Sequence, residues 1–192
     1  MNKLKIHFFF ILSFISIISF SQHGESTIFF EDGSTKKWNI KNISNYRYNN
    51  KFTKPVVRIE LNDEKSNELI VYEFIQLKKK KKKVFVKVDF EGEKTTLYSK
   101  KTTMLSSTNQ NNNSFSNRTD GNIFYAKKNN ELYSIELSSE IGGAMSVYGS
   151  GFKKRALVFF SDCPQLVEKI KIKEIKKKDK LKAFEYYEEN CN

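Results

Sequence analysis

The sequence is poor in histidine and cysteine, and each scarcity removes a class of chemistry. Only His7 and His23 occur among 192 residues, so a catalytic dyad or a zinc site built on imidazole groups has almost no ligands to draw on. Two cysteines, Cys163 and Cys191, are too few for a cysteine-rich metal site. The chain also lacks a Gly-x-Ser-x-Gly elbow, a phosphate-binding glycine loop and a His-Glu-x-x-His motif. We therefore expect no cofactor, and we favour a non-enzymatic protein over an enzyme.

Arginine is also scarce, although positive charge is abundant. The formal net charge is +12, and lysine supplies almost all of it. Lysine is a hydrated point charge, whereas arginine is the usual residue for bidentate phosphate recognition. Heavy use of lysine, asparagine, isoleucine and phenylalanine is typical of AT-rich coding sequence, which accounts for part of the charge. We therefore expect no specific nucleic-acid partner.

Long apolar runs are missing except at the start of the chain. Lys3 and Lys5 precede an apolar run over 6–20, which is shorter than the roughly 20 residues of a spanning helix. The run ends in Ser19-Phe20-Ser21, with small residues where signal peptidase accepts them. We interpret 1–21 as a signal peptide, with an uncleaved anchor as the alternative. Cleavage leaves 22–192 as a single domain without a transmembrane span, exported to the periplasm, the cell envelope or the extracellular space.

The region 22–152 has the pattern of short antiparallel strands. Asp32-Gly33 is a strong hairpin signal, and apolar and charged residues alternate over 56–61 with the period of a half-buried strand. Turn signals recur about every ten residues, which predicts an antiparallel meander, either sandwich-like or an open barrel. We interpret the polar, asparagine-rich stretch 106–121 as a mobile loop, because it has too little apolar surface to order itself. The expected strands span 26–31, 36–43, 56–61, 69–77, 84–90, 95–98, 122–127 and 131–137.

The region 153–192 changes to helical periodicity, so the expected fold class is α+β with a C-terminal helical hairpin. Cys163-Pro164 suits the start of the first helix, and Asp179 suits the cap of the second. An antiparallel hairpin places Cys163 beside Cys191, and export removes the reducing environment that keeps thiols unpaired. We predict a disulfide between them. The alternative is a nucleophilic Cys163 at a helix N-terminus, which needs a base that the sequence does not supply.

Six consecutive lysines are the most conspicuous local feature of the chain. One interpretation is a solvated hairpin tip or a charged edge that prevents aggregation. The other is a site for an anionic surface, where each lysine contributes about 1 kcal/mol. The six residues are Lys78, Lys79, Lys80, Lys81, Lys82 and Lys83, and the patch would be extended by Lys36, Lys37, Lys127, Lys128, Lys153 and Lys154 if they share its face.

The closing segment resembles that of small, uncharacterised exported proteins of the bacterial cell envelope. The resemblance rests on Ser161-Asp162-Cys163-Pro164-x-Leu166 and on Tyr186-Tyr187-x-x-Asn190-Cys191. A strand–Asp-Gly–strand hairpin over 28–40 adds to it. It implies export and a paired cysteine couple, and it implies no activity.

Three hypotheses of function remain open. The leading one is a non-enzymatic binding or structural module of the cell envelope, whose partner is an anionic envelope surface or another envelope protein. The second is a polyanion-binding protein that acts through Lys78–Lys83. The third is a hydrolase that uses paired carboxylates on the concave face of the sheet, for which Asp89 with Glu91 and Glu188 with Glu189 are candidates.

Overall fold

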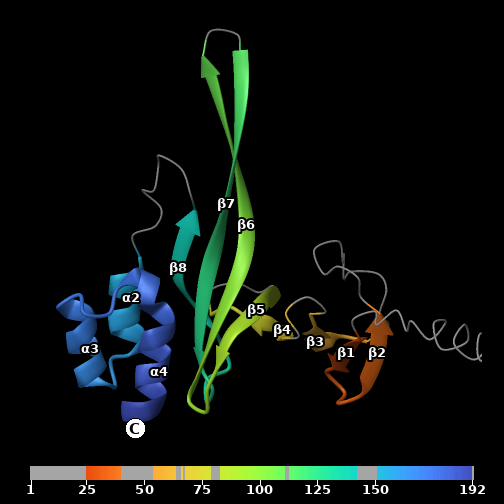
Figure 1. The fold of residues 1–192 in the computed structure, drawn as a ribbon, viewed down its shortest axis with the longest axis horizontal. Helices are drawn as coiled ribbons and strands as arrows, with labels where there is room; N and C mark the ends of the chain where they lie inside the picture. Colours follow the sequence, from red (N-terminus) through yellow and green to blue (C-terminus); the bar gives the residue numbers. More distant parts are fainter. Residues whose placement is uncertain are drawn as a thin grey trace, which may run out of the picture.

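The computed structural model describes residues 25–39, 54–63, 66, 68–78, 83–110, 113–141 and 151–191. These residues form an open eight-stranded antiparallel sheet, in the order β2-β1-β3-β4-β5-β6-β7-β8, followed by helices (Figure 1). The strands are β1 (Glu25–Phe30), β2 (Thr35–Asn39), β3 (Val56–Asn62), β4 (Leu69–Gln76), β5 (Lys83–Glu91), β6 (Thr95–Gln110), β7 (Asn113–Lys128) and β8 (Ile135–Ile141). The helical elements are α2 (Phe152–Phe159), α3 (Pro164–Lys171), the 3-10 turn η4 (Lys177–Asp179) and α4 (Lys180–Asn190).

The α+β class and the antiparallel meander are therefore confirmed. Most strands begin and end within a few residues of their predicted bounds, although β6 and β7 are much longer than predicted. The first hairpin turns where predicted, with Gly33 at φ 80°, a conformation that glycine adopts without steric cost. Asp32 Oδ1 accepts a hydrogen bond from Ser34 N at 3.0 Å, which fixes the turn. Residues 40–43, the end of the predicted second strand, lie outside the described part.

The sheet curls between β4 and β8. Ser134, just before β8, donates its backbone N–H to the carbonyl of Gln76 at 2.9 Å and accepts a hydrogen bond from Lys78 N at 3.1 Å. These two bonds form an isolated parallel bridge between Leu77 and Ser134. Since β4 and β8 are four places apart in the strand order, the strands between them must bend around an apolar cluster of Ile75, Leu77, Val86, Tyr98 and Tyr125.

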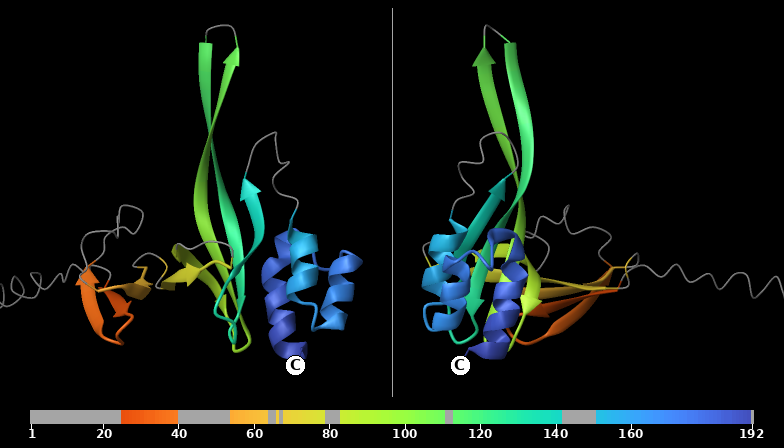
Figure 2. Two further views of the ribbon diagram at one scale, coloured as in Figure 1. Left: turned by 180° about the vertical axis from the view of Figure 1, so that it is seen from behind. Right: turned by 60° about the vertical axis from the view of Figure 1, so that its left-hand side comes forward.

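The helices cover the other face of the sheet at its β6–β8 end (Figures 1 and 2). Leu97, Ala126 and Leu137 from the strands pack in one core with the helical side chains. Leu97 and Tyr98 are adjacent in β6 but belong to different clusters, as expected because successive strand residues point to opposite faces. The buried helical residues of this core include Phe152, Ala156, Phe159, Phe160, Leu166, Ile170, Ile175, Phe184 and Tyr187.

The prediction of a two-helix hairpin over 153–192 was incomplete, because α2 precedes it. Phe152, Ala156 and Phe159 are the buried residues of α2. The charged stretch Lys153-Lys154-Arg155 separates the first two of them, so the sequence shows no clear apolar face and does not predict this helix. The other two helices are as predicted in outline, with Pro164 in the first turn of α3 and Asp179 at the N-cap of α4.

No helix in the described ranges combines the length and apolar character needed to cross a bilayer.

The predicted mobile loop over 106–121 was also wrong as an assignment of secondary structure. Residues 106–110 lie in β6 and 113–121 in β7, while 111–112 lie outside the described part. β5 pairs with β6 only over 96–99, and β8 pairs with β7 only over 121–126. The rest of the β6–β7 ladder is a two-stranded ribbon that projects from the sheet (Figure 1). Its ladder is formed by main-chain groups, which a prediction from side-chain composition does not detect.

Candidate functional site

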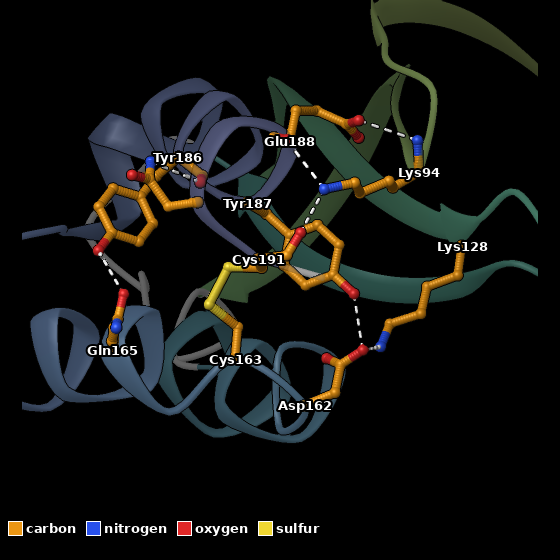
Figure 3. Close-up of a disulfide and its surroundings, with 10 residues drawn as sticks. Lys94, Lys128, Asp162, Cys163, Gln165, Tyr186, Tyr187, Glu188 and Cys191 are labelled. Atoms are coloured by element: carbon orange, nitrogen blue, oxygen red, sulfur yellow. Dashed lines mark hydrogen bonds and ion pairs between the residues drawn. A yellow bond between two sulfur atoms is a disulfide. The ribbon is translucent and has the colours of Figure 1, made fainter.

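Cys163 and Cys191 form a disulfide that joins the start of α3 to the end of α4 (Figure 3). Their Cα atoms are 5.5 Å apart, within the usual range of about 4.4–6.8 Å. Both residues are buried. The predicted pairing is confirmed, and a sulfur atom held in a disulfide has no thiolate with which to attack a substrate. The cysteine pair is therefore a structural clasp.

A second set of contacts attaches the clasp to β7. Asp162 Oδ2 accepts hydrogen bonds from Tyr187 Oη and Lys128 Nζ, both at 2.6 Å (Figure 3). Burial opposes ionisation of Asp162, but these two donors outweigh it and lower the pKa of the carboxyl below its ordinary value of 3.8. Burial and the neighbouring Asp162 raise the pKa of Tyr187. Lys128 is therefore engaged in the fold and does not extend a surface patch.

The end of α4 is bound to the turn between β5 and β6. The Glu188 carboxylate accepts hydrogen bonds from Lys94 N at 2.9 Å, from Thr95 N at 2.7 Å and from Thr95 Oγ1 at 2.6 Å. Lys94 Nζ donates to the carbonyls of Glu188 and Cys191, where a cation also complements the helix dipole. A Cβ atom on Gly92 would clash with the Glu188 carboxyl group, so glycine leaves room for this contact. Glu188 thus has a structural role and not the role of a paired catalytic acid.

A cluster of carboxylates does gather on the sheet, around Arg58 of β3. The guanidinium donates to Glu60 at 2.9 Å, to Glu73 at 2.9 Å and to both oxygens of Glu91 at 2.8 and 3.0 Å. Tyr98 Oη donates to Glu73 at 3.1 Å. Hydrogen bonds from Arg58 lower the pKa of Glu91, whereas a general acid needs a raised one. The cluster is therefore suited to link β3, β4 and β5 through ion pairs.

We expect the substitution Arg58→Leu to lower the free energy of unfolding at neutral pH by about 2 kcal/mol, since it leaves three carboxylates without their donor. Glu91 has a depressed pKa, so its contribution is present above the ordinary value of 4.5 and is lost as the pH falls below it. The difference between variant and wild type should therefore shrink on acidification. Urea denaturation at pH values from 3 to 7 measures it.

Arg155→Leu is the matched control, because Arg155 pairs with Glu136 at 2.8 Å in a more exposed place. We expect that variant to lose less than about 1 kcal/mol. Equal losses in the two variants, or a difference from wild type that does not change with pH, would contradict the assigned role of Arg58.

The predicted run Lys78–Lys83 is described only at its two ends. Lys78 is exposed, and Lys83 Nζ lies 3.6 Å from Glu31 Oε1. Lys79, Lys80, Lys81 and Lys82 lie outside the described residues, so this candidate site stays a prediction. Among the lysines that would extend it, Lys36 lies over the ring of Trp38 and Lys153 donates to the carbonyl of Lys171.

Another group of lysines surrounds a pocket in the helical segment. The pocket has a volume of about 250 Å³ and lies between α2, the end of α3 and the connection to α4. Its apolar lining consists of Phe152, Ile170 and Ile175, and its charged lining consists of Lys153, Lys173, Lys176 and Lys177, which we call the pocket lysines. Sequence analysis missed this group because Lys153 of α2 and the lysines of the α3–α4 connection come together only in the folded protein.

The charge of the pocket lysines is not balanced by neighbouring carboxylates. Two carboxylates of adjoining segments pair elsewhere, Glu174 with Lys169 and Glu140 with Lys180, each at 2.5 Å. Within the described part of the chain, no ion pair joins a carboxylate to any pocket lysine. The four pocket lysines therefore line the pocket without a carboxylate partner among the described residues.

Lys173 has an unusual backbone conformation. Its φ is 65°, and no other described residue except glycine has a positive φ. It follows the C-cap of α3, where Glu174 N bonds to the Lys169 carbonyl at 2.9 Å and Lys173 N to the Ile170 carbonyl at 3.3 Å. This Schellman arrangement usually has glycine at the position of Lys173. The chain thus places a charged side chain at the pocket where an uncharged residue would be less strained.

No group of three or more His, Cys, Asp or Glu residues in the described ranges is arranged to hold a metal ion. Comparison of the chain with protein-family models, with curated proteins and with solved structures finds no match.

Proposed function

We propose that this protein is an exported, non-enzymatic binding module of the cell envelope that attaches to an anionic surface through its helical segment. The observation that carries the proposal is the accumulation of lysine around the α3–α4 connection. Between Lys169 and Lys182 there are eight lysines and two acidic residues. Clusters of about four to eight basic residues are typical of segments that bind anionic membranes.

Two further features support this proposal. Export is supported by the leader-like start of the chain and by the disulfide, because the cytosol keeps thiols reduced. Lys180 anchors the lysine-rich connection to the sheet. Its side chain is buried, and its Nζ atom donates to Glu140 of β8 at 2.5 Å and lies 4.0 Å from the centre of the Phe124 ring of β7. The lysines around it are thus presented by a fixed scaffold.

Vesicle flotation tests the proposal. Wild-type protein should bind vesicles that contain phosphatidylglycerol and should not bind vesicles of phosphatidylcholine alone. Binding should weaken as salt is added, because exposed charges are screened. The triple variant Lys176→Gln/Lys177→Gln/Lys178→Gln should lose affinity on the order of 100-fold, at about 1 kcal/mol per lysine.

The matched control is Lys100→Gln/Lys101→Gln/Lys127→Gln, which removes the same charge from β6 and β7. We expect it to lose much less affinity than the helical variant. Binding that does not respond to salt, or equal losses in the two triple variants, would overturn the proposal.

A further inference from the structure

We infer that the pocket between α2, α3 and the α3–α4 connection binds a small amphiphilic anion, an alkyl or aryl group that carries a carboxylate or a phosphate. This inference rests on the proposed function, since it uses the same helical segment, and it adds a ligand class and a binding site. Three properties of the pocket carry it: its lining, its charge and its size.

The lining of the pocket combines apolar residues of the core with lysine side chains. Phe152, Ile170 and Ile175 are buried members of the core that α2, α3 and α4 share with the sheet. The apolar base of the pocket is therefore held by the same packing that holds the fold, and it exists before any ligand arrives. Apolar walls with a few placed polar groups are typical of sites for small organic molecules.

The charge specifies an anion. Lys153 Nζ and Lys177 Nζ donate to main-chain carbonyls, at 2.9 Å to Lys171 and at 3.3 Å to Ser139, so each has a defined position and neither is paired with a carboxylate. Lys173 and Lys176 are exposed at the same pocket. A carboxylate or a phosphate bound at the pocket would supply the opposite charge that these lysines lack.

The left-handed backbone conformation of Lys173 adds to these three properties. Backbone strain of this kind persists where the surrounding structure enforces it, and it clusters at ligand sites. Glycine would satisfy the same helix end with less strain. The lysine therefore contributes its side chain to the pocket at a cost to the backbone.

The size restricts the ligand to a small molecule. About 250 Å³ lies just below the range of roughly 300–1,000 Å³ that is usual for ligand pockets. A single short chain or one aromatic ring with its acid group suits that space, whereas the two chains of a membrane lipid do not. A small free anion is therefore the ligand we assign to the pocket itself.

Thermal unfolding with three probes tests the inference on the full disulfide-bonded chain. Octanoate carries both an acid and an apolar chain, inorganic phosphate carries charge alone, and 1-octanol carries an apolar chain alone. We expect octanoate to raise the melting temperature in a saturable way and the other two to have much smaller effects at equal concentration. Equal effects of octanoate and phosphate, or no effect of octanoate, would overturn the inference.

Lys173→Gly separates binding from stability. This variant should melt about 2–4 °C higher than wild type without ligand, because the strain is relieved, yet its affinity for octanoate should fall about tenfold. The matched control is Lys182→Gln, which removes one charge from an exposed position of α4 outside the pocket lining and should leave octanoate affinity unchanged. Equal octanoate affinity in wild type and Lys173→Gly would overturn the inference.

The two proposals can fail separately. If the wild-type protein binds octanoate but does not bind vesicles that contain phosphatidylglycerol, the proposed function is overturned and the assignment of the pocket stands.

Discussion

Replacing Cys163 and Cys191 by serine is expected to lower the free energy of unfolding by about 3–4 kcal/mol. The disulfide closes a loop with a sequence separation of 28 residues, and closure of that length restricts the unfolded chain by about this amount. For a domain of this size, the melting temperature should fall by about 10 °C. Urea denaturation of the double variant beside the oxidised wild type measures the difference.

A reducing agent provides the internal control for this experiment. It should destabilise the wild type by the same amount and should leave the double variant unchanged. A loss below about 1 kcal/mol would mean that the contacts around the clasp, above all Tyr187 and Lys128 with Asp162, hold the helices without the covalent bond.

The second large effect is expected at the end of α4. Glu188→Ala should lower the free energy of unfolding by about 3 kcal/mol, because it leaves the backbone N–H groups of Lys94 and Thr95 without an acceptor in a partly buried place. Glu189→Ala is the matched control, since Glu189 is the exposed neighbour with the same charge. It should cost less than about 0.5 kcal/mol. Chemical denaturation of the two variants gives both values.

A substitution at Gly92 tests the contact between Glu188 and the β5–β6 turn by changing the turn instead of the glutamate. Gly92→Ala should cost about 2 kcal/mol, because its Cβ meets the Glu188 carboxyl group. In the presence of Glu188→Ala that clash is removed, so the double variant should be more stable than the sum of the single losses allows. Additive losses would show that Glu188 and Gly92 do not act as a unit.

The parts of the fold that follow from the sequence are those encoded by neighbouring residues. Asp32-Gly33 specifies a turn wherever it stands between two strand-like segments, and Pro164 marks the first turn of α3 through its fixed φ. The Cys163–Cys191 pair could be predicted because the chain contains no other cysteine. Such features need no knowledge of distant residues.

The features that could not be predicted depend on contacts between distant residues. Glu188 and Lys94 are 94 positions apart, and Arg58 reaches Glu91 across β4. Neither pair leaves a local pattern, because each forms only when the strand order and register are set. The pocket lysines could not be predicted for the same reason, because α2 and the α3–α4 connection meet only in the folded protein.

The most direct test of the proposed function asks whether an anionic lipid contacts the helical segment or the run Lys78–Lys83. An NMR titration with a short-chain, soluble phosphatidylglycerol locates the contact on the backbone amides directly. We expect the largest chemical-shift changes within 169–182 and at Phe152, and small changes over 78–83. Changes centred on 78–83, with the amides of 169–182 unaffected, would contradict the proposed function.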